Sequence, residues 1–182
     1  ADISATVEEF VPMGYFTAGK PEADEDMIKF TAFDRMLKAD RGYFSSLPAA
    51  TTTIAVLNEM SAFLKVPIAT GGLSSITIKR PDGYTCREVL SYISQMYAGF
   101  AICNRQGQIE IKKYVVSNIN IAPARYWDTF KHNDFPYTFQ RIVCYTGKDQ
   151  NGESISITAG SGNRELTISN PLMTQSILNS VA

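Results

Sequence analysis

The chain has very little histidine: His132 is the only one among 182 residues. Zinc sites built from several histidines, and the two-histidine helix of metalloproteases, are therefore excluded. A Ser-His-Asp triad would have to use His132, and no Gly-x-Ser-x-Gly segment accompanies it. Because His132 lies between Lys131 and Asn133 in a polar, irregular stretch, we expect it in an exposed loop.

The sequence also lacks a long apolar run and an excess of one charge. No run approaches the roughly 20 apolar residues that span a bilayer. The formal net charge is −1, which argues against the basic stripe of a nucleic-acid-binding protein. No basic segment followed by an apolar one opens the chain, so no secretory signal is visible. We expect a globular protein of one or two domains without nucleic-acid or membrane partners.

Cysteine is scarce and odd in number: Cys86, Cys103 and Cys144. Each lies among apolar neighbours in a predicted helix or strand, which favours reduced, buried thiols. A Cys103–Cys144 bridge between neighbouring strands is the alternative. Cys86 is predicted at a helix N-terminus, where the helix dipole lowers a thiol pKa. A Cys86–His132 pair is thus a second alternative, although nothing in the sequence brings the two together.

The clearest pattern present is an alternating segment at 27–32 that passes directly into a helical one at 33–39. Ile28, Phe30 and Ala32 fall on one face of the predicted strand. Asp34 stands at the junction, where a short carboxylate accepts hydrogen bonds from the first free N–H groups of a helix. This pattern builds structure rather than an active site, and it indicates a scaffold protein.

A charged segment, residues 20–26, precedes this strand and is predicted to be a hairpin loop after a strand at 7–19. Its four carboxylates raise the question of a calcium site. The calcium-loop pattern requires a glycine at its sharp turn and a distal glutamate, and neither is in place. A solvated loop is therefore expected. The carboxylates are Glu22, Asp24, Glu25 and Asp26.

The rest of the chain alternates helical and strand patterns. A helix is expected over 51–65, with Ile54, Leu57, Met60 and Leu64 on one face. Thr85 and Glu88 have the spacing of a capping box, which predicts the start of a third helix. The further predicted elements are that helix at 86–98, stopped by Gly99, a hairpin of 100–104 with 108–112, and strands at 76–78, 139–145, 154–158 and 165–168. Short helices mixed with hairpins predict an α+β fold.

The last segment, from Pro171 to Ala182, has a helical apolar pattern formed by Leu172, Ile177, Leu178 and Val181. An apolar helix face must pack on something, and no further segment follows this one. We therefore expect the sequence to be a central piece of a longer protein.

Glycoside hydrolysis needs a pair of carboxylates, and the sequence offers several glutamates for it. Glu88 is already explained by capping, and Glu110 by an outward position on a strand. No catalytic, metal or cofactor residue is assigned, and we expect neither an enzyme nor a cofactor. The candidates weighed were Glu8, Glu9, Glu59, Glu88 and Glu110.

The densest aromatic cluster lies in an irregular region, and we predict it to be an interaction surface. Aromatic side chains anchor loops and subunit contacts well. A carbohydrate-binding platform is the alternative. The residues are Tyr126, Trp127, Phe130, Phe135 and Tyr137, followed by Phe139.

Three segments, in this order, carry a family resemblance. The first joins Gly14-Tyr15-Phe16 to a strand that ends Thr-Ala-Phe-Asp-Arg-Met-Leu-Lys at 31–38. The second is the helix, strand, Gly turn and strand at 83–111, and the third is Gly162 to Met173. Together they resemble the tail (baseplate) hub proteins of bacteriophages and prophages of Gram-positive bacteria.

The resemblance implies partial β-barrels that form a ring as three copies, with an α+β insert. Residues 1–32 would end the first hub barrel, 33–138 would be the insert, and 139–182 would begin the second barrel. The implied function is structural: a tail hub component in the virion tail that binds copies of itself and adjacent tail proteins. The alternatives are the hub of a contractile injection particle and, from another class, a cell-wall hydrolase or glycan-binding module. In the resembled family, lytic activity belongs to separate domains.

Overall fold

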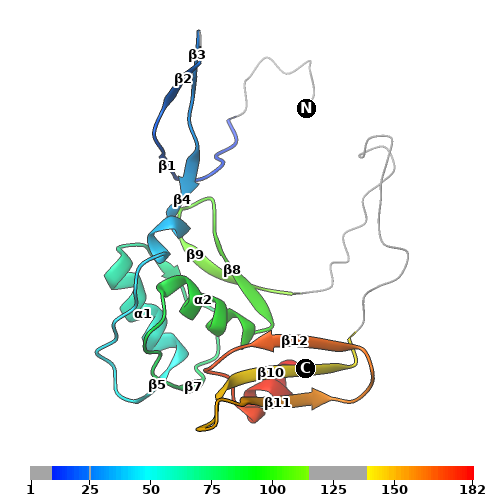
Figure 1. Ribbon diagram of the computed structural model, residues 1–182. Coiled ribbons are helices and arrows are strands. Elements are labelled where there is room, and N and C mark those ends of the chain that lie inside the picture. The colour runs from blue at the N-terminus through cyan, green and yellow to red at the C-terminus, as the bar shows by residue number, and fades with distance from the viewer. Residues whose placement is uncertain (1–9, 25, 115–138) are drawn as a thin grey trace. The chain divides into compact units, whose positions relative to one another are not determined.

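The computed structural model describes residues 10–24, 26–114 and 139–182 (Figure 1). They form the predicted α+β fold, with small sheets of two or three strands, none of which closes into a barrel within these residues. The chain divides into two compact units. The first contains the residues up to Ser91 with Ala101–Ile111, and the second contains Tyr92–Phe100 with Lys112–Ala182.

The first unit begins with an antiparallel ribbon, residues 16–34. Strand β1 (Phe16–Ala18) pairs with β4 (Ala32–Asp34), and β2 (Glu22–Asp24) pairs with β3 (Met27–Lys29) (Figure 1). The segment expected to be a loop at 20–26 therefore contains a strand, because Glu22 and Lys29 face each other in the ladder and opposite charges there stabilise the pairing.

The ribbon passes directly into a short 3₁₀ helix, η1 (Arg35–Ala39). The Asp34 carboxylate accepts a hydrogen bond of 2.9 Å from the Met36 N–H. The predicted cap at the junction is confirmed, and it begins a 3₁₀ rather than an α-helical turn.

Helix α1 (Thr53–Leu64) is capped by Thr52, whose side chain accepts from the Ala55 N–H at 3.2 Å. Leu57, Met60 and Leu64 are buried as predicted. Ile54 is only half-buried, whereas Thr53 and Val56 are buried. The face of α1 that packs on the core is therefore shifted from the predicted one.

Helix α2 (Cys86–Gln95) begins at the predicted capping box. The Glu88 N–H donates to Thr85 Oγ1 at 3.2 Å, and the Thr85 N–H donates to the Glu88 carboxylate at 2.7 Å. The helix ends earlier than 98, and the left-handed residue after it is Ala98 (φ 50) rather than Gly99. Gly99 serves another purpose, since a Cβ there would lie 2.3 Å from the Lys112 carbonyl oxygen.

The close approach at Gly99 belongs to the predicted hairpin, which is confirmed as β8 (Gly99–Cys103) and β9 (Ile109–Lys113). Helix α2 and this hairpin contribute residues to both units. Short strands complete the first unit: β5 (Ala50–Thr52) pairs with β7 (Thr77–Lys79), and β6 (Ile68–Ala69) pairs in parallel with β9.

The second unit is built on a three-stranded sheet with β10 (Arg141–Lys148) at its centre. Strand β11 (Ser154–Gly160) pairs antiparallel and β12 (Glu165–Ser169) pairs parallel to it. Helix α3 (Gln175–Val181) packs against β11, and its Leu178 is fully buried. The apolar face of this helix therefore has a packing partner within the described chain.

All three cysteines are free, so the alternative Cys103–Cys144 bridge is not formed. Cys86 and Cys144 are buried, as expected for reduced thiols in the core, whereas Cys103 is half-buried. Over the described residues, helices α1 to α3 are all too short to cross a membrane.

Candidate interaction surfaces

The ribbon carries an apolar face that no described residue of the first unit covers. Residues paired across a ladder share a face, so Ala18 lies on the same face as Ala32, and Ala23 on the same face as Ile28. Alternation along the strand adds Phe30 to the face that Ile28 occupies. Three large side chains stand out to solvent here: Phe16 is 56% exposed, Ile28 74% and Phe30 60%.

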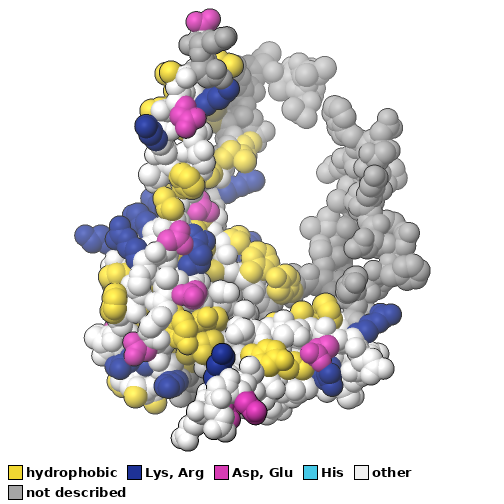
Figure 2. All heavy atoms as spheres, in the orientation of Figure 1, with side chains coloured by type: hydrophobic (Ala, Val, Ile, Leu, Met, Phe, Trp, Pro, Cys, Tyr) yellow, Lys and Arg dark blue, Asp and Glu magenta, His cyan; other side chains and the backbone are white. Residues whose placement is uncertain are grey.

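This exposure continues into the segment before the ribbon, where large apolar side chains also face solvent. Figure 2 shows hydrophobic side chains on the surface of this part of the chain. A two-stranded ribbon is marginally stable alone in water, and a contiguous exposed apolar patch marks an interaction site. The apolar face of the ribbon is therefore the strongest candidate interface in the described chain. The preceding exposed residues are Phe10, Val11, Met13 and Tyr15.

The base of the ribbon is held by Arg35. Its guanidinium carbon lies 4.8 Å from the centre of the Tyr15 ring, and its Nη1 donates to the Gly107 carbonyl at 3.2 Å. Gly107 has φ +72, and a Cβ there would lie 2.9 Å from the Tyr15 ring and 3.0 Å from the Arg35 guanidinium carbon. Stacking of arginine on an aromatic ring is favourable, and only glycine leaves room for it here.

A second ordered surface surrounds Glu59 on α1. Its carboxylate accepts hydrogen bonds from the Tyr43 hydroxyl (2.5 Å) and the Ser45 hydroxyl (2.6 Å). It also accepts from the Ser46 N–H (2.9 Å) and the Ser46 hydroxyl (2.8 Å). The loop at 43–46 is thereby held on the helix, and Phe44 within it is 85% exposed.

These contacts set the charge state of Glu59. Burial acts to raise its pKa, but the hydrogen bonds from Ser45, Tyr43 and Ser46 outweigh burial and lower the pKa to about 2. Burial and the Glu59 carboxylate raise the pKa of Tyr43. A general acid in glycoside hydrolysis needs a raised pKa, so Glu59 is a structural carboxylate and is not suited to that role.

Two of the other candidate carboxylates, Glu88 and Glu110, also have structural partners. The Thr85 N–H and hydroxyl lower the pKa of Glu88, and Glu110 accepts from Asn104 Nδ2 at 3.3 Å. Glu8 and Glu9 lie outside the described residues. Within the described ranges, no group of three or more His, Cys, Asp and Glu residues could hold a metal ion.

Cys86 differs from its expectation as a helix N-terminal thiol. Burial raises its pKa, and this outweighs the lowering by the Cys86 backbone N–H and the Arg41 charge. Its side chain is fully buried, so the predicted activating effect of the helix is wrong for this thiol. His132, the proposed partner, lies outside the described residues.

The predicted aromatic interaction surface also falls outside the described residues, and it stays a prediction. Its members are Tyr126, Trp127, Phe130, Phe135 and Tyr137. Phe139, next to them in the sequence, is described and 43% exposed.

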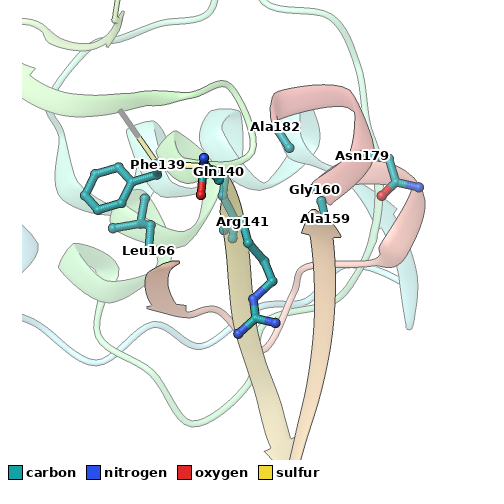
Figure 3. A pocket seen from close by; sticks show the side chains of 9 residues that line it. Phe139, Gln140, Arg141, Ala159, Gly160, Leu166, Asn179 and Ala182 are labelled. Atoms are coloured by element: carbon teal, nitrogen blue, oxygen red, sulfur yellow. The ribbon is translucent and has the colours of Figure 1, made fainter. Parts of the chain in front are cut away.

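Phe139 lines an open hollow of about 530 Å³ at the end of the β10–β11–β12 sheet. Figure 3 shows Phe139 and Leu166 on one side of the Arg141 side chain and Asn179 on the other. Arg141 is paired with Glu165, and its buried Nε has no hydrogen-bond partner among the described residues. In a ligand site a few polar groups converge on one point. The polar groups of this hollow do not.

A smaller hollow of about 300 Å³ lies on the face of the same sheet that α3 covers. Its wall is almost entirely apolar. The sheet and α3 contribute Ile142, Leu166, Ile168, Leu178 and Val181 to this wall, and the rest of the unit contributes Gln95, Ala98, Gly99 and Tyr114. The apolar face of this sheet is thus only partly filled by its own unit.

Comparisons with known proteins show which solved structures this architecture resembles. No family model and no curated protein matches the chain. Among solved structures, the chain is similar to the tail protein from Neisseria meningitidis MC58, with a TM-score of 0.53 and 10% identity over 93% of this chain and 58% of that one. It is also similar to the prophage tail protein gp18 from Listeria monocytogenes EGD-e, with a TM-score of 0.49 and 14% identity over 92% and 60%. The chain therefore spans about three fifths of the length of either protein. The first likeness shows a shared fold.

Proposed function

We propose that this chain is a structural component of a phage or prophage tail, and that it acts in the tail hub. The observation that carries the proposal is the fold shared with the tail protein of Neisseria meningitidis over 93% of the chain. The order of the three hub-like sequence segments supports the same assignment. In this proposal, residues 1–32 and 139–182 belong to two hub barrels and 33–138 form the insert.

The apolar ribbon face supports a role in assembly. A protein that functions alone in water rarely leaves such a patch exposed, whereas a subunit buries it against its neighbours. The proposed partners are copies of the same protein, as a trimer, and adjacent tail proteins. The place of action is the virion tail.

The chemistry of the described side chains agrees with a structural role. Glu59 and Glu88 are held ionised by hydrogen bonds, and the Cys86 thiol is buried. Each of these groups stabilises a local structure, and none combines with another into an acid, base or nucleophile pair.

The test is made on the full protein that contains this chain. Light scattering should give the mass of three copies, and antibody labelling of intact particles should mark the tail. A protein that stays monomeric at high concentration and is absent from the particles would contradict the proposal.

A further inference from the structure

The two edges of the ribbon differ in their capacity to pair with another strand. The first strand is interrupted by Gly19 and Pro21, and proline has no N–H to donate. The second strand, 27–34, contains neither proline nor glycine. Its two strand segments, β3 and β4, therefore both keep their outward backbone donors and acceptors, and within the described residues no strand pairs with their outer edge.

The direction of these groups follows from one hydrogen bond. The Gly19 N–H donates to the Thr31 carbonyl at 2.6 Å across the ribbon. Because hydrogen-bonding direction alternates along an antiparallel strand, the N–H of the next residue, Ala32, is directed away from the partner strand. The N–H of Ala18, which pairs with Ala32, is likewise directed away from its partner strand, and so points to the opposite edge of the ribbon.

The sheet of the second unit has a matching edge. On β11, the Thr158 carbonyl accepts from Gln175 Nε2 at 2.9 Å, and α3 packs on this strand. On the opposite side, β12 pairs only with β10 among the described residues. β12 contains no proline or glycine, and its Leu166 and Ile168 face the hollow beside α3. The edge of β12 is thus the one suited to accept another strand.

Accordingly, we propose that strand 27–34 of one copy adds to the β12 edge of a second copy, an inference that rests on the proposed self-assembly. Strand addition of this kind gains affinity from main-chain hydrogen bonds and specificity from alternate side chains. Ile28, Phe30 and Ala32 then extend the apolar face formed by Leu166 and Ile168. The polar alternate residues, Thr31 and Thr167 among them, share the opposite face.

A second copy of the chain fits this role because each copy carries both the strand that adds, 27–34, and the β12 edge that accepts it. Each strand alternates apolar and polar residues, so in a parallel register Phe30 and Ala32 lie beside Leu166 and Ile168, and Thr31 lies beside Thr167. The two patches differ, so the interface is head-to-tail, and such interfaces generate rings when the rotation closes.

The first experiment uses the pair Ala18 and Ala32 in the full protein. Ala32→Pro removes a donor at the joint, and we expect the mass from light scattering to fall from the oligomer to the single chain. Ala18→Pro makes the same change on the opposite edge of the same ribbon and should leave the oligomer intact. Loss of the oligomer in both variants, or in neither, would overturn the proposed edge.

The second experiment is a cross-link between copies. A mixture of Thr31→Cys and Thr167→Cys proteins should form a disulfide-linked dimer on oxidation, whereas either variant alone and the unaltered protein should not. A dimer in Thr31→Cys alone would show ribbon-to-ribbon pairing and would overturn the joint. An oligomeric protein with no cross-link in the mixture also overturns it and leaves the proposed function standing, whereas a monomeric parent protein refutes the assembly role itself.

Discussion

At the scale of single residues, the described side chains that look reactive are engaged in structure. Glu59 binds the 43–46 loop to α1 through hydroxyl and backbone donors. Arg35 joins the ribbon to the β8–β9 turn by contacting Tyr15 and Gly107. Both contacts connect segments that are far apart in the sequence, so the loss of either contact should measurably lower the free energy of unfolding.

Glu59→Ala should lower the free energy of unfolding at pH 7 by about 2 kcal/mol, because it removes hydrogen bonds to a charged acceptor. The folded-state pKa of Glu59 is lowered from 4.5 to about 2. The stability from this group is therefore present above about pH 4.5 and is lost as the pH falls toward 2. Urea unfolding across this range should show the difference from wild type shrinking with acid. Asn58→Ala, on the exposed side of the same helix, is the control and should change little.

Gly107→Ala should destabilise the protein more than Gly83→Ala. Both glycines have positive φ, +72 and +78, so the backbone strain of alanine is similar. A Cβ at Gly107 also meets Tyr15 and Arg35, whereas nothing lies within 4 Å of one at Gly83. Strain alone costs about 1–2 kcal/mol, and urea unfolding should show a larger loss at Gly107. Equal losses would mean that the Arg35 contact contributes nothing.

At the scale of elements, short local signals determine where helices begin, and packing determines where they end. Helix α2 starts at the reciprocal bonds of Thr85 and Glu88. Its C-terminal turn ends at Ala98 in the left-handed region, beside Gly99, where the Lys112 backbone approaches too closely for a side chain.

Thr85→Ala should cost about 1 kcal/mol of stability, the usual value for losing a helix N-cap. Ser91→Ala, at an exposed position of the same helix, should stay within about 0.5 kcal/mol of wild type. The comparison is made by urea unfolding at neutral pH. A Thr85→Ala protein as stable as Ser91→Ala would refute the role of the capping box.

At the scale of the whole molecule, the proposed assembly role rests on exposed surfaces of the described chain. The described chain has an exposed apolar ribbon and an open sheet edge, and its fold is shared with the tail protein from Neisseria meningitidis MC58. A hydrolase would instead need a raised carboxylate pKa beside a second carboxylate.

Incubation of the protein with purified peptidoglycan should release no soluble fragments and leave the protein in the supernatant. The physical reason is that Glu59 and Glu88 are held ionised and cannot serve as general acids near neutral pH. Glu59→Ala should give the same result as wild type. Release of fragments by wild type, abolished in Glu59→Ala, would establish the hydrolase alternative.

The sequence by itself determined those features whose partners are close along the chain. The Asp34 cap, the Thr85–Glu88 box and the β8–β9 hairpin all depend on residues a few positions apart, so spacing was enough to predict them. The α+β class followed from the same local periodicities.

Only the tertiary structure decided what those elements contact. Glu59 meets donors 13 to 16 residues away, and Arg35 meets Gly107 across 72 positions, and no local pattern encodes such distances. The burial of Cys86 reversed the expected effect of its helix terminus, and the packing of α3 on β11 supplied the partner that the sequence did not reveal. In each case the outcome depends on desolvation and close packing, which arise only when distant segments meet.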